Sequence, residues 1–239
     1  MKRFYKSAAA AANDGGVFVV RLDGKSVRTP LGRELALPTA TLAEAIAAEW
    51  AAQPVDGKVA PSTMPLTRLA VTGLDRAADR REQVVDDICK YADSDLLCYR
   101  AETPVDLALR QARAWQPAVD WAARRHGVRL DVLSGITHRA QSAESIAACR
   151  RAVAAHGDLA LSALFNLTAM LGSVVLALAV SDGWMDGVAA YEAAELDALY
   201  AIEKWGEDSE ARGRLDRLRR DATACATFLA ALGPARLTS

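Results

Sequence analysis

The sequence predicts an α+β protein in which a small antiparallel β-rich N-terminal unit is followed by a larger α-helical bundle. β-Branched, aromatic and turn-forming residues are concentrated between residues 16 and 37. From Pro61 onward, apolar residues instead recur three or four positions apart, the period of a helix with one buried face. We therefore expect two domains, residues 1–60 with one covering helix and residues 61–239, and 239 residues are enough to bury a core.

Three short strands are predicted in the N-terminal unit, over residues 16–22, 25–28 and 33–37. Asp23 and Gly24 supply a tight turn between the first two. A helix follows, because Thr41 and Glu44 have capping-box spacing and Leu42, Ile46 and Trp50 repeat every four residues. We expect this helix to cover the sheet, with Trp50 packing against it as a structural residue.

Prolines, glycines and capping residues divide the helical part. The expected helix starts are Pro65, Thr103–Pro104, Ser142, Asp186 and Ser209. The expected ends are Gly127, Gly157, Gly206 and Gly233, with Pro117 kinking or restarting one helix. A further helix is marked by apolar residues between 84 and 89, and residues 128–133 form a short extended piece.

Residues 159–181 carry no charge and are numerous enough to span a bilayer. However, Ser162, Asn166 and Thr168 are polar, and no Lys or Arg lies near either end to anchor a membrane helix. Gly172 interrupts the run. We expect two consecutive core helices and no stable membrane insertion.

The charge balance argues against a general nucleic-acid-binding protein, since 29 Lys and Arg face 30 Asp and Glu. The four cysteines are scattered, with no C-x-x-C pair, as is typical of reduced thiols in a cytosolic protein. The N-terminus is too weakly apolar for a secretory signal. These features predict a bacterial cytoplasmic protein, which we expect to be monomeric when free.

Sequence motifs for catalysis are sparse. Gly24, Lys25 and Ser26 resemble the end of a phosphate-binding loop, but that motif needs a glycine where Val19 stands. Asp93 and Asp95 are an alternative, as the carboxylates of a metal-dependent enzyme, although two ligands are too few for a divalent cation. The other interpretation of these two acids is a capped turn to which Arg100 contributes an ion pair. No histidine has metal-ligand spacing, and no cofactor or metal is expected.

Three segments are distinctive, namely PSTMPLTRLA (61–70), YADSDLLCYRA (91–101) and WGEDSE (205–210). With them, the chain resembles the assembly-chaperone family for the alpha subunit of the F1 sector of ATP synthase, found in mitochondria and alpha-proteobacteria. The resemblance implies a protein without chemistry of its own. Such a protein binds the free alpha subunit and shields the face destined for the beta subunit, without nucleotide hydrolysis.

A chaperone of this kind needs exposed apolar anchors ringed by polar groups, and Trp, Tyr, Met and Arg dominate such contacts. The predicted partner-binding residues stand at element ends and are Met64, Pro65, Arg68, Tyr99, Arg100, Trp205 and Glu207. Glu203 and Glu207 lie at a predicted helix C-terminus, where acids oppose the helix dipole, so a partner's basic group would compensate them. The resemblance places a client-contacting acid in this segment, with Glu207 favoured over Glu203 and Asp208.

Overall fold

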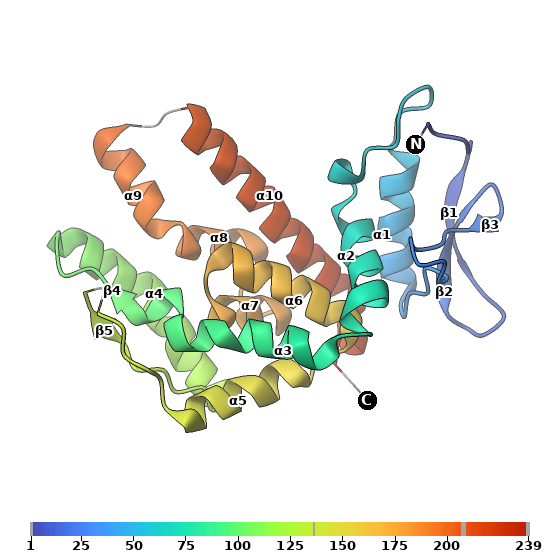
Figure 1. The fold of residues 1–239 in the computed structure, drawn as a ribbon. Helices are drawn as coiled ribbons and strands as arrows, with labels where there is room; N and C mark the ends of the chain where they lie inside the picture. The colour runs from blue at the N-terminus through green and yellow to red at the C-terminus, as the bar shows by residue number, and fades with distance from the viewer. Residues whose placement is uncertain (1, 136, 207–208, 238–239) are drawn as a thin grey trace. The chain divides into compact units, whose positions relative to one another are not determined.

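The computed structural model describes residues 2–135, 137–206 and 209–237 and confirms an α+β fold (Figure 1). Its contacts divide the chain into two compact units. Unit 1 comprises Met1–Arg81, His156–Ala163 and Thr227–Ser239, and unit 2 comprises Glu82–Ala155 and Leu164–Ala226. The domain boundary between residues 60 and 61 stays a prediction.

The sheet of unit 1 has the strand order β1-β2-β3, with β1 at Ala8–Ala12, β2 at Phe18–Leu22 and β3 at Lys25–Ser26. Both neighbouring pairs are antiparallel, and Ala10 lies opposite Val20. Asp23 and Gly24 have φ of 46° and 84°, as a two-residue type I′ hairpin turn requires, so the predicted turn is confirmed. The Asp23 carboxylate also accepts hydrogen bonds from the backbone N–H groups of Lys6 and Ser7.

The third predicted strand is wrong. Residues 33–37 form only isolated bridges, Arg28 with Glu34 and Phe18 with Leu37, and the alanine run Ala8–Ala12 forms the third strand instead. Alanine favours helix in isolation, but here pairing with β2 and packing against α1 (Ala40–Ala51) decide the conformation.

Helix α1 covers the sheet, as predicted (Figure 1). Its buried face includes Leu42 and Ile46. The cap is two residues earlier than predicted, because the Thr39 side chain, rather than Thr41, accepts the hydrogen bond from Leu42 N. Trp50 is half-buried beside Tyr5, whose ring centroid lies 5.8 Å away and whose hydroxyl donates to the Trp50 carbonyl.

Most of the remaining chain is helical. The helices are α2 (Pro65–Thr72), α3 (Arg81–Cys89), α4 (Val105–His126), α5 (Ala143–Ala154), α6 (Asp158–Leu171), α7 (Val174–Ser181), α8 (Gly187–Ala194), α9 (Leu196–Trp205) and α10 (Ser209–Leu232). A π-helical turn, Gly73–Ala77, continues α2. Short 3₁₀ turns occupy Pro61–Thr63, Lys90–Ser94, Leu96–Cys98 and Gly233–Arg236. Two short parallel strands, β4 (Tyr99–Arg100) and β5 (Leu133–Ser134), pair within unit 2.

The uncharged run forms two helices, as predicted. Gly172 ends α6 with a φ of 64°, and the Ser173 hydroxyl caps α7 by accepting from Leu176 N at 3.1 Å. Every side chain of α7 is buried, which places this helix in the core of unit 2. Among the described residues, none of the helices has the length and apolar character needed to cross a membrane.

Two helix predictions need correction. A single helix was expected from Asp186 to Gly206, but the chain breaks at Glu195 and forms α8 and α9. Pro117 lies inside α4, so it does not restart the helix, and the alternative of a kink there stays a prediction. The predicted caps at Ser142 and Asp186 are confirmed, since their side chains accept from Ser145 N and Ala189 N.

Candidate functional site

The end of α9 and the first turns of α4 form an exposed surface in unit 2, which we call the α4–α9 surface. It comprises Val105, Asp106, Leu109, Arg110, Glu203, Lys204 and Trp205. Three of its residues are large apolar side chains left in solvent, Val105 being 67% exposed, Leu109 52% and Trp205 79%. Val105 and Leu109 are four residues apart and therefore share one face of α4. Solvated apolar side chains grouped among charges are typical of a protein-binding surface.

Ion pairs join the two helices of this surface. Arg110 donates to both carboxylate oxygens of Glu203, at 2.5 and 2.9 Å. One turn earlier on α4, Asp106 accepts from the Tyr200 hydroxyl at 2.8 Å and pairs with Lys204 at 3.3 Å. The hydrogen bond from Arg110 lowers the pKa of Glu203, and the one from Tyr200 lowers the pKa of Asp106. Both acids are therefore charged at neutral pH.

The arrangement corrects one expectation about Glu203. Its position near the C-terminus of α9 indicated that a partner would supply a compensating basic group. Arg110 of the same chain supplies that group. Glu207, the favoured client-contacting acid, lies outside the described residues, and so does Asp208. Trp205, the large apolar residue that precedes them, is 79% exposed at the end of α9.

The predicted partner-binding residues at the start of α2 differ in exposure. Met64 is only 2% exposed, whereas Pro65 is half-buried and Arg68 is exposed. Met64 directly precedes α2, whose first N–H groups are capped by a side chain of α1. The carboxylate of Glu49 accepts from Leu66 N at 2.7 Å and from Thr67 N at 2.8 Å. In this structure Met64 packs in the core of unit 1 and is not offered to a partner.

Glu49 is an unpredicted residue of that cap. Burial raises the pKa of its carboxyl, although the hydrogen bonds from Leu66 and Thr67 oppose the shift. One sequence signal was available, since α2 begins at Pro65 with no Ser, Thr, Asp or Asn directly before it. A helix without its own cap needs acceptors from elsewhere in the chain.

Asp95 and Asp93 form separate hydrogen-bonded turns. Asp95 is completely buried, and its carboxylate accepts from Leu97 N, Ser173 Oγ and Val175 N at 3.0 to 3.2 Å. Burial raises the pKa of Asp95 to about 6 against the opposing effect of these hydrogen bonds. Asp93 accepts from Gln141 N and lies 3.1 Å from His138 Nε2. Across the described ranges, no three His, Cys, Asp or Glu residues are grouped so as to hold a metal ion.

Arg100 lies inside unit 2 and does not pair with either carboxylate as expected. Its guanidinium donates to the carbonyls of Leu97 and Gln111, at 2.9 and 3.1 Å. It also lies 5.3 Å from the ring centroid of Trp115. Burial lowers the pKa of Arg100. Neighbouring Tyr99 is half-buried. Among the predicted partner-binding residues in the described part of unit 2, Trp205 is therefore the one with a largely exposed side chain.

Comparisons with known proteins assign the chain to a family. The sequence profile described as ATP12 chaperone protein matches residues 2–123, half of the chain. The chain belongs to the ATP12 chaperone family. Family membership confirms the prediction of a chaperone in ATP synthase assembly. It also agrees with the resemblance seen in the sequence alone.

Relatives of this ATP12-family chaperone cover almost its whole length. Mitochondrial atp12 of Schizosaccharomyces pombe is 25% identical over 222 residues, which are 88% of this chain and 75% of the yeast protein. The crystal structure of Atp12 from Paracoccus denitrificans is 33% identical, has a TM-score of 0.89 and covers 96% of this chain and 97% of its own. A candidate chaperone from Agrobacterium tumefaciens is 38% identical with the same TM-score, over 97% of this chain and 86% of its own.

Proposed function

We propose that this chain binds the free alpha subunit of F1-ATPase and covers the face that the alpha subunit later gives to the beta subunit. The α4–α9 surface is the contact, with Trp205 as its central anchor. Holding and release take place without nucleotide hydrolysis, metal or other catalysis. The protein works as a monomer in the bacterial cytoplasm, and two of the similar structures come from bacterial species.

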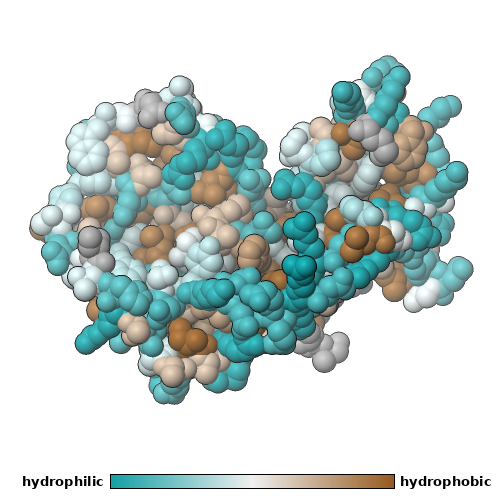
Figure 2. Space-filling view, in the orientation of Figure 1, coloured by the Kyte–Doolittle hydropathy of each residue, from teal (hydrophilic) through white to brown (hydrophobic). Residues whose placement is uncertain are grey.

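The exposure of Trp205 is the observation that carries this proposal. A tryptophan that is 79% exposed leaves most of a large apolar ring in water, which is unfavourable unless a partner covers it. Tryptophan is also among the residues most enriched at the energetic centres of protein interfaces. On the face seen in Figure 2, hydrophobic side chains lie singly or in small groups among hydrophilic ones. Such a surface is better suited to binding through a few strongly contributing residues than through a broad apolar contact.

The test is binding and protection of purified alpha subunit. We expect an equimolar amount of the wild-type chain to suppress light scattering by alpha subunit diluted from denaturant, and to retain alpha in preference to beta on an affinity column. Trp205→Ala should weaken alpha binding about tenfold or more, because loss of an interface hot spot costs roughly 2 kcal/mol. Its fold should be unchanged, since the ring is solvated in the free protein.

Phe4→Ala is the matched control. Phe4 is also a largely exposed aromatic residue, but it belongs to unit 1. This variant should bind the alpha subunit as the wild type does. Retention of beta as strongly as alpha, or equal binding by the Trp205→Ala and wild-type chains, would contradict the proposal.

A further inference from the structure

An open pocket of about 430 Å³ lies on unit 1. Its walls are the loop Thr29–Arg33 and the segment 73–80 that continues α2. The lining residues are Leu31, Asp75, Arg76, Asp79 and Arg80, and we call it the Arg76–Arg80 pocket. Its volume is within the range of pockets that bind small ligands or peptide side chains.

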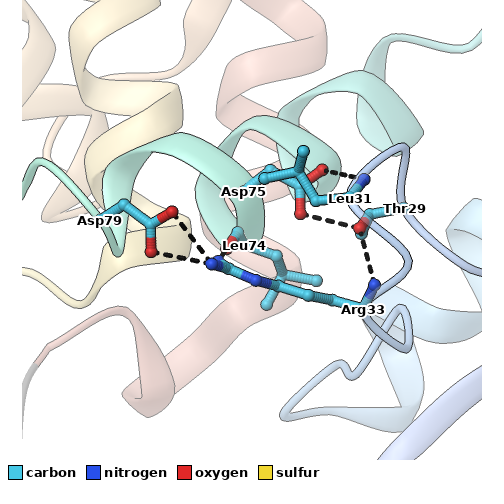
Figure 3. A network of polar contacts seen from close by, with 6 residues as sticks. All are labelled: Thr29, Leu31, Arg33, Leu74, Asp75 and Asp79. Carbon is cyan, nitrogen blue, oxygen red and sulfur yellow. Dashed lines mark hydrogen bonds and ion pairs between the residues drawn. The ribbon is translucent and has the colours of Figure 1, made fainter.

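The two acids of the pocket are fully engaged within the chain. Asp75 is buried, and it accepts from the Thr29 hydroxyl at 2.7 Å and from Leu31 N at 3.2 Å (Figure 3). Asp79 receives Arg33 Nη2 on both carboxylate oxygens, at 2.8 and 2.9 Å. Arg33 also donates to the Leu74 carbonyl, so the loop is tied to the π-helical turn at several points.

The two arginines of the pocket are, by contrast, exposed. In the part of the chain that the structure describes, no carboxylate lies within ion-pair distance of the Arg76 or Arg80 guanidinium. Asp75 and Asp79 bring two negative charges, and Arg33, Arg76 and Arg80 bring three positive charges, which leaves a net charge of +1. Because Arg33 and Asp79 offset each other, the charge offered to a ligand is that of Arg76 and Arg80 less that of the buried Asp75.

The backbone holds these arginines on one rigid segment. Arg80 N donates to Arg76 O at 3.0 Å, so the two residues are one helical turn apart on the same face. Between them in the chain, Ala78 N donates to Gly73 O, five residues earlier, at 3.2 Å. Gly73 is packed so closely that an added Cβ would lie 2.9 Å from the Leu159 Cα. The π-helical turn is thus fixed against the start of α6. Single π-helical turns are frequent at functional sites.

We propose that the Arg76–Arg80 pocket binds an acidic side chain of the client polypeptide, next to an apolar residue that contacts Leu31. Two arginines on one face can share the two oxygens of a carboxylate, an arrangement that arginine favours. Leu31 is 63% exposed and gives the pocket an apolar wall that an inorganic anion does not use. The inference rests on the proposed function for the presence of a polypeptide client, and it names the chemistry of one segment of that client.

A peptide titration of the full chain tests this without the alpha subunit. The probe is the end-capped peptide Ala-Leu-Glu-Leu-Ala, with Gln in place of Glu as its matched neutral form. Side-chain and amide NMR signals of Arg76, Arg80 and Leu31 should shift on titration with the Glu peptide. The Gln peptide should bind about tenfold more weakly, since it lacks charge-assisted hydrogen bonds. Affinity for the Glu peptide should fall as salt is added.

Variants and a second ligand separate the possible outcomes. Arg76→Ala/Arg80→Ala should lose the response, while Arg124→Ala/Arg220→Ala, two exposed arginines of unit 2, should keep it. Leu31→Ala should weaken peptide binding only. Any one of three results would overturn the inference. These are equal affinity for the Glu and Gln peptides, an unchanged response in the Arg76→Ala/Arg80→Ala chain, and binding of inorganic phosphate as tight as that of the Glu peptide. Each of these results leaves the capture of alpha subunit at the α4–α9 surface to be judged by its own assay.

Discussion

Gly187→Ala should destabilise unit 2, although alanine is the better helix former. Gly187 is the first residue of α8, and a Cβ added there would lie 2.8 Å from the Ala222 carbonyl oxygen and 2.9 Å from the Ala226 Cβ. Both atoms belong to the rigid framework of α10, so the two helices must separate. Such overpacking costs about 1–3 kcal/mol, whereas helix propensity returns at most about 1 kcal/mol. We expect a net loss of about 1–2 kcal/mol.

Gly213→Ala is the matched substitution and should have the opposite sign. Gly213 lies inside α10, and its nearest new contact would be the flexible Arg217 Nη1 at 3.6 Å. Helix propensity then dominates, and the free energy of unfolding should rise by about 0.5–1 kcal/mol. Urea unfolding followed by far-UV circular dichroism measures the free energy of unfolding of both variants. In thermal unfolding, the Tm should shift by about 2–4 °C per kcal/mol. A Gly187→Ala chain as stable as wild type would refute the steric argument.

Asp95 predicts a pH dependence of stability. The pKa of Asp95 is about 6 in the folded state, and its ordinary value is 3.8. Between these two pH values the folded state holds a proton that the unfolded state has released. The contribution of Asp95 to the free energy of unfolding is therefore fully present below about pH 4. It falls by up to roughly 3 kcal/mol as the pH rises through about 6. The stability of wild type relative to Asp95→Asn should fall over that window, and a flat difference would contradict the assignment. Arg110→Ala and Glu203→Ala should show a coupling of about 0.2–1 kcal/mol in a double-mutant cycle, because both side chains are about half exposed. The coupling should shrink in high salt, and a coupling that salt leaves unchanged would indicate a pair shielded from solvent.

Local signals predicted the parts of this fold that local chemistry controls. The Asp23–Gly24 turn, the Ser142 and Asp186 caps and the break at Gly172 each depend on residues within one turn of the chain. The alanine strand is different, because nothing in Ala8–Ala12 itself favours an extended backbone. Its conformation comes from pairing with β2 and packing under α1, contacts that single-sequence periodicity does not contain.

Contacts between distant positions also limited the prediction of the site. Arg110 and Glu203 are 93 residues apart, and the sequence gives no reason to join them. The same is true of Asp95, which caps the start of α7 across a separation of 80 residues. Exposure was hardest to predict, because Met64 and Trp205 look equally suited to a partner surface. Only the tertiary packing shows that one is buried and the other solvated.

Contacts within the α4–α9 surface hold the end of α9, where Trp205 is exposed. Arg110 and Lys204 both lie over the Tyr200 ring, at 5.1 and 5.2 Å, while pairing with Glu203 and Asp106. Single exposed ion pairs contribute little to stability, but this network joins the last turns of α9 to α4 at several points. Gly206, with a φ of 89°, then ends the helix directly after Trp205. The helical position of the anchor is set during folding, so binding need not order this backbone, and less affinity is lost to entropy. The function proposed above, holding and release without nucleotide hydrolysis, needs such preorganisation, because affinity and release must both come from one surface.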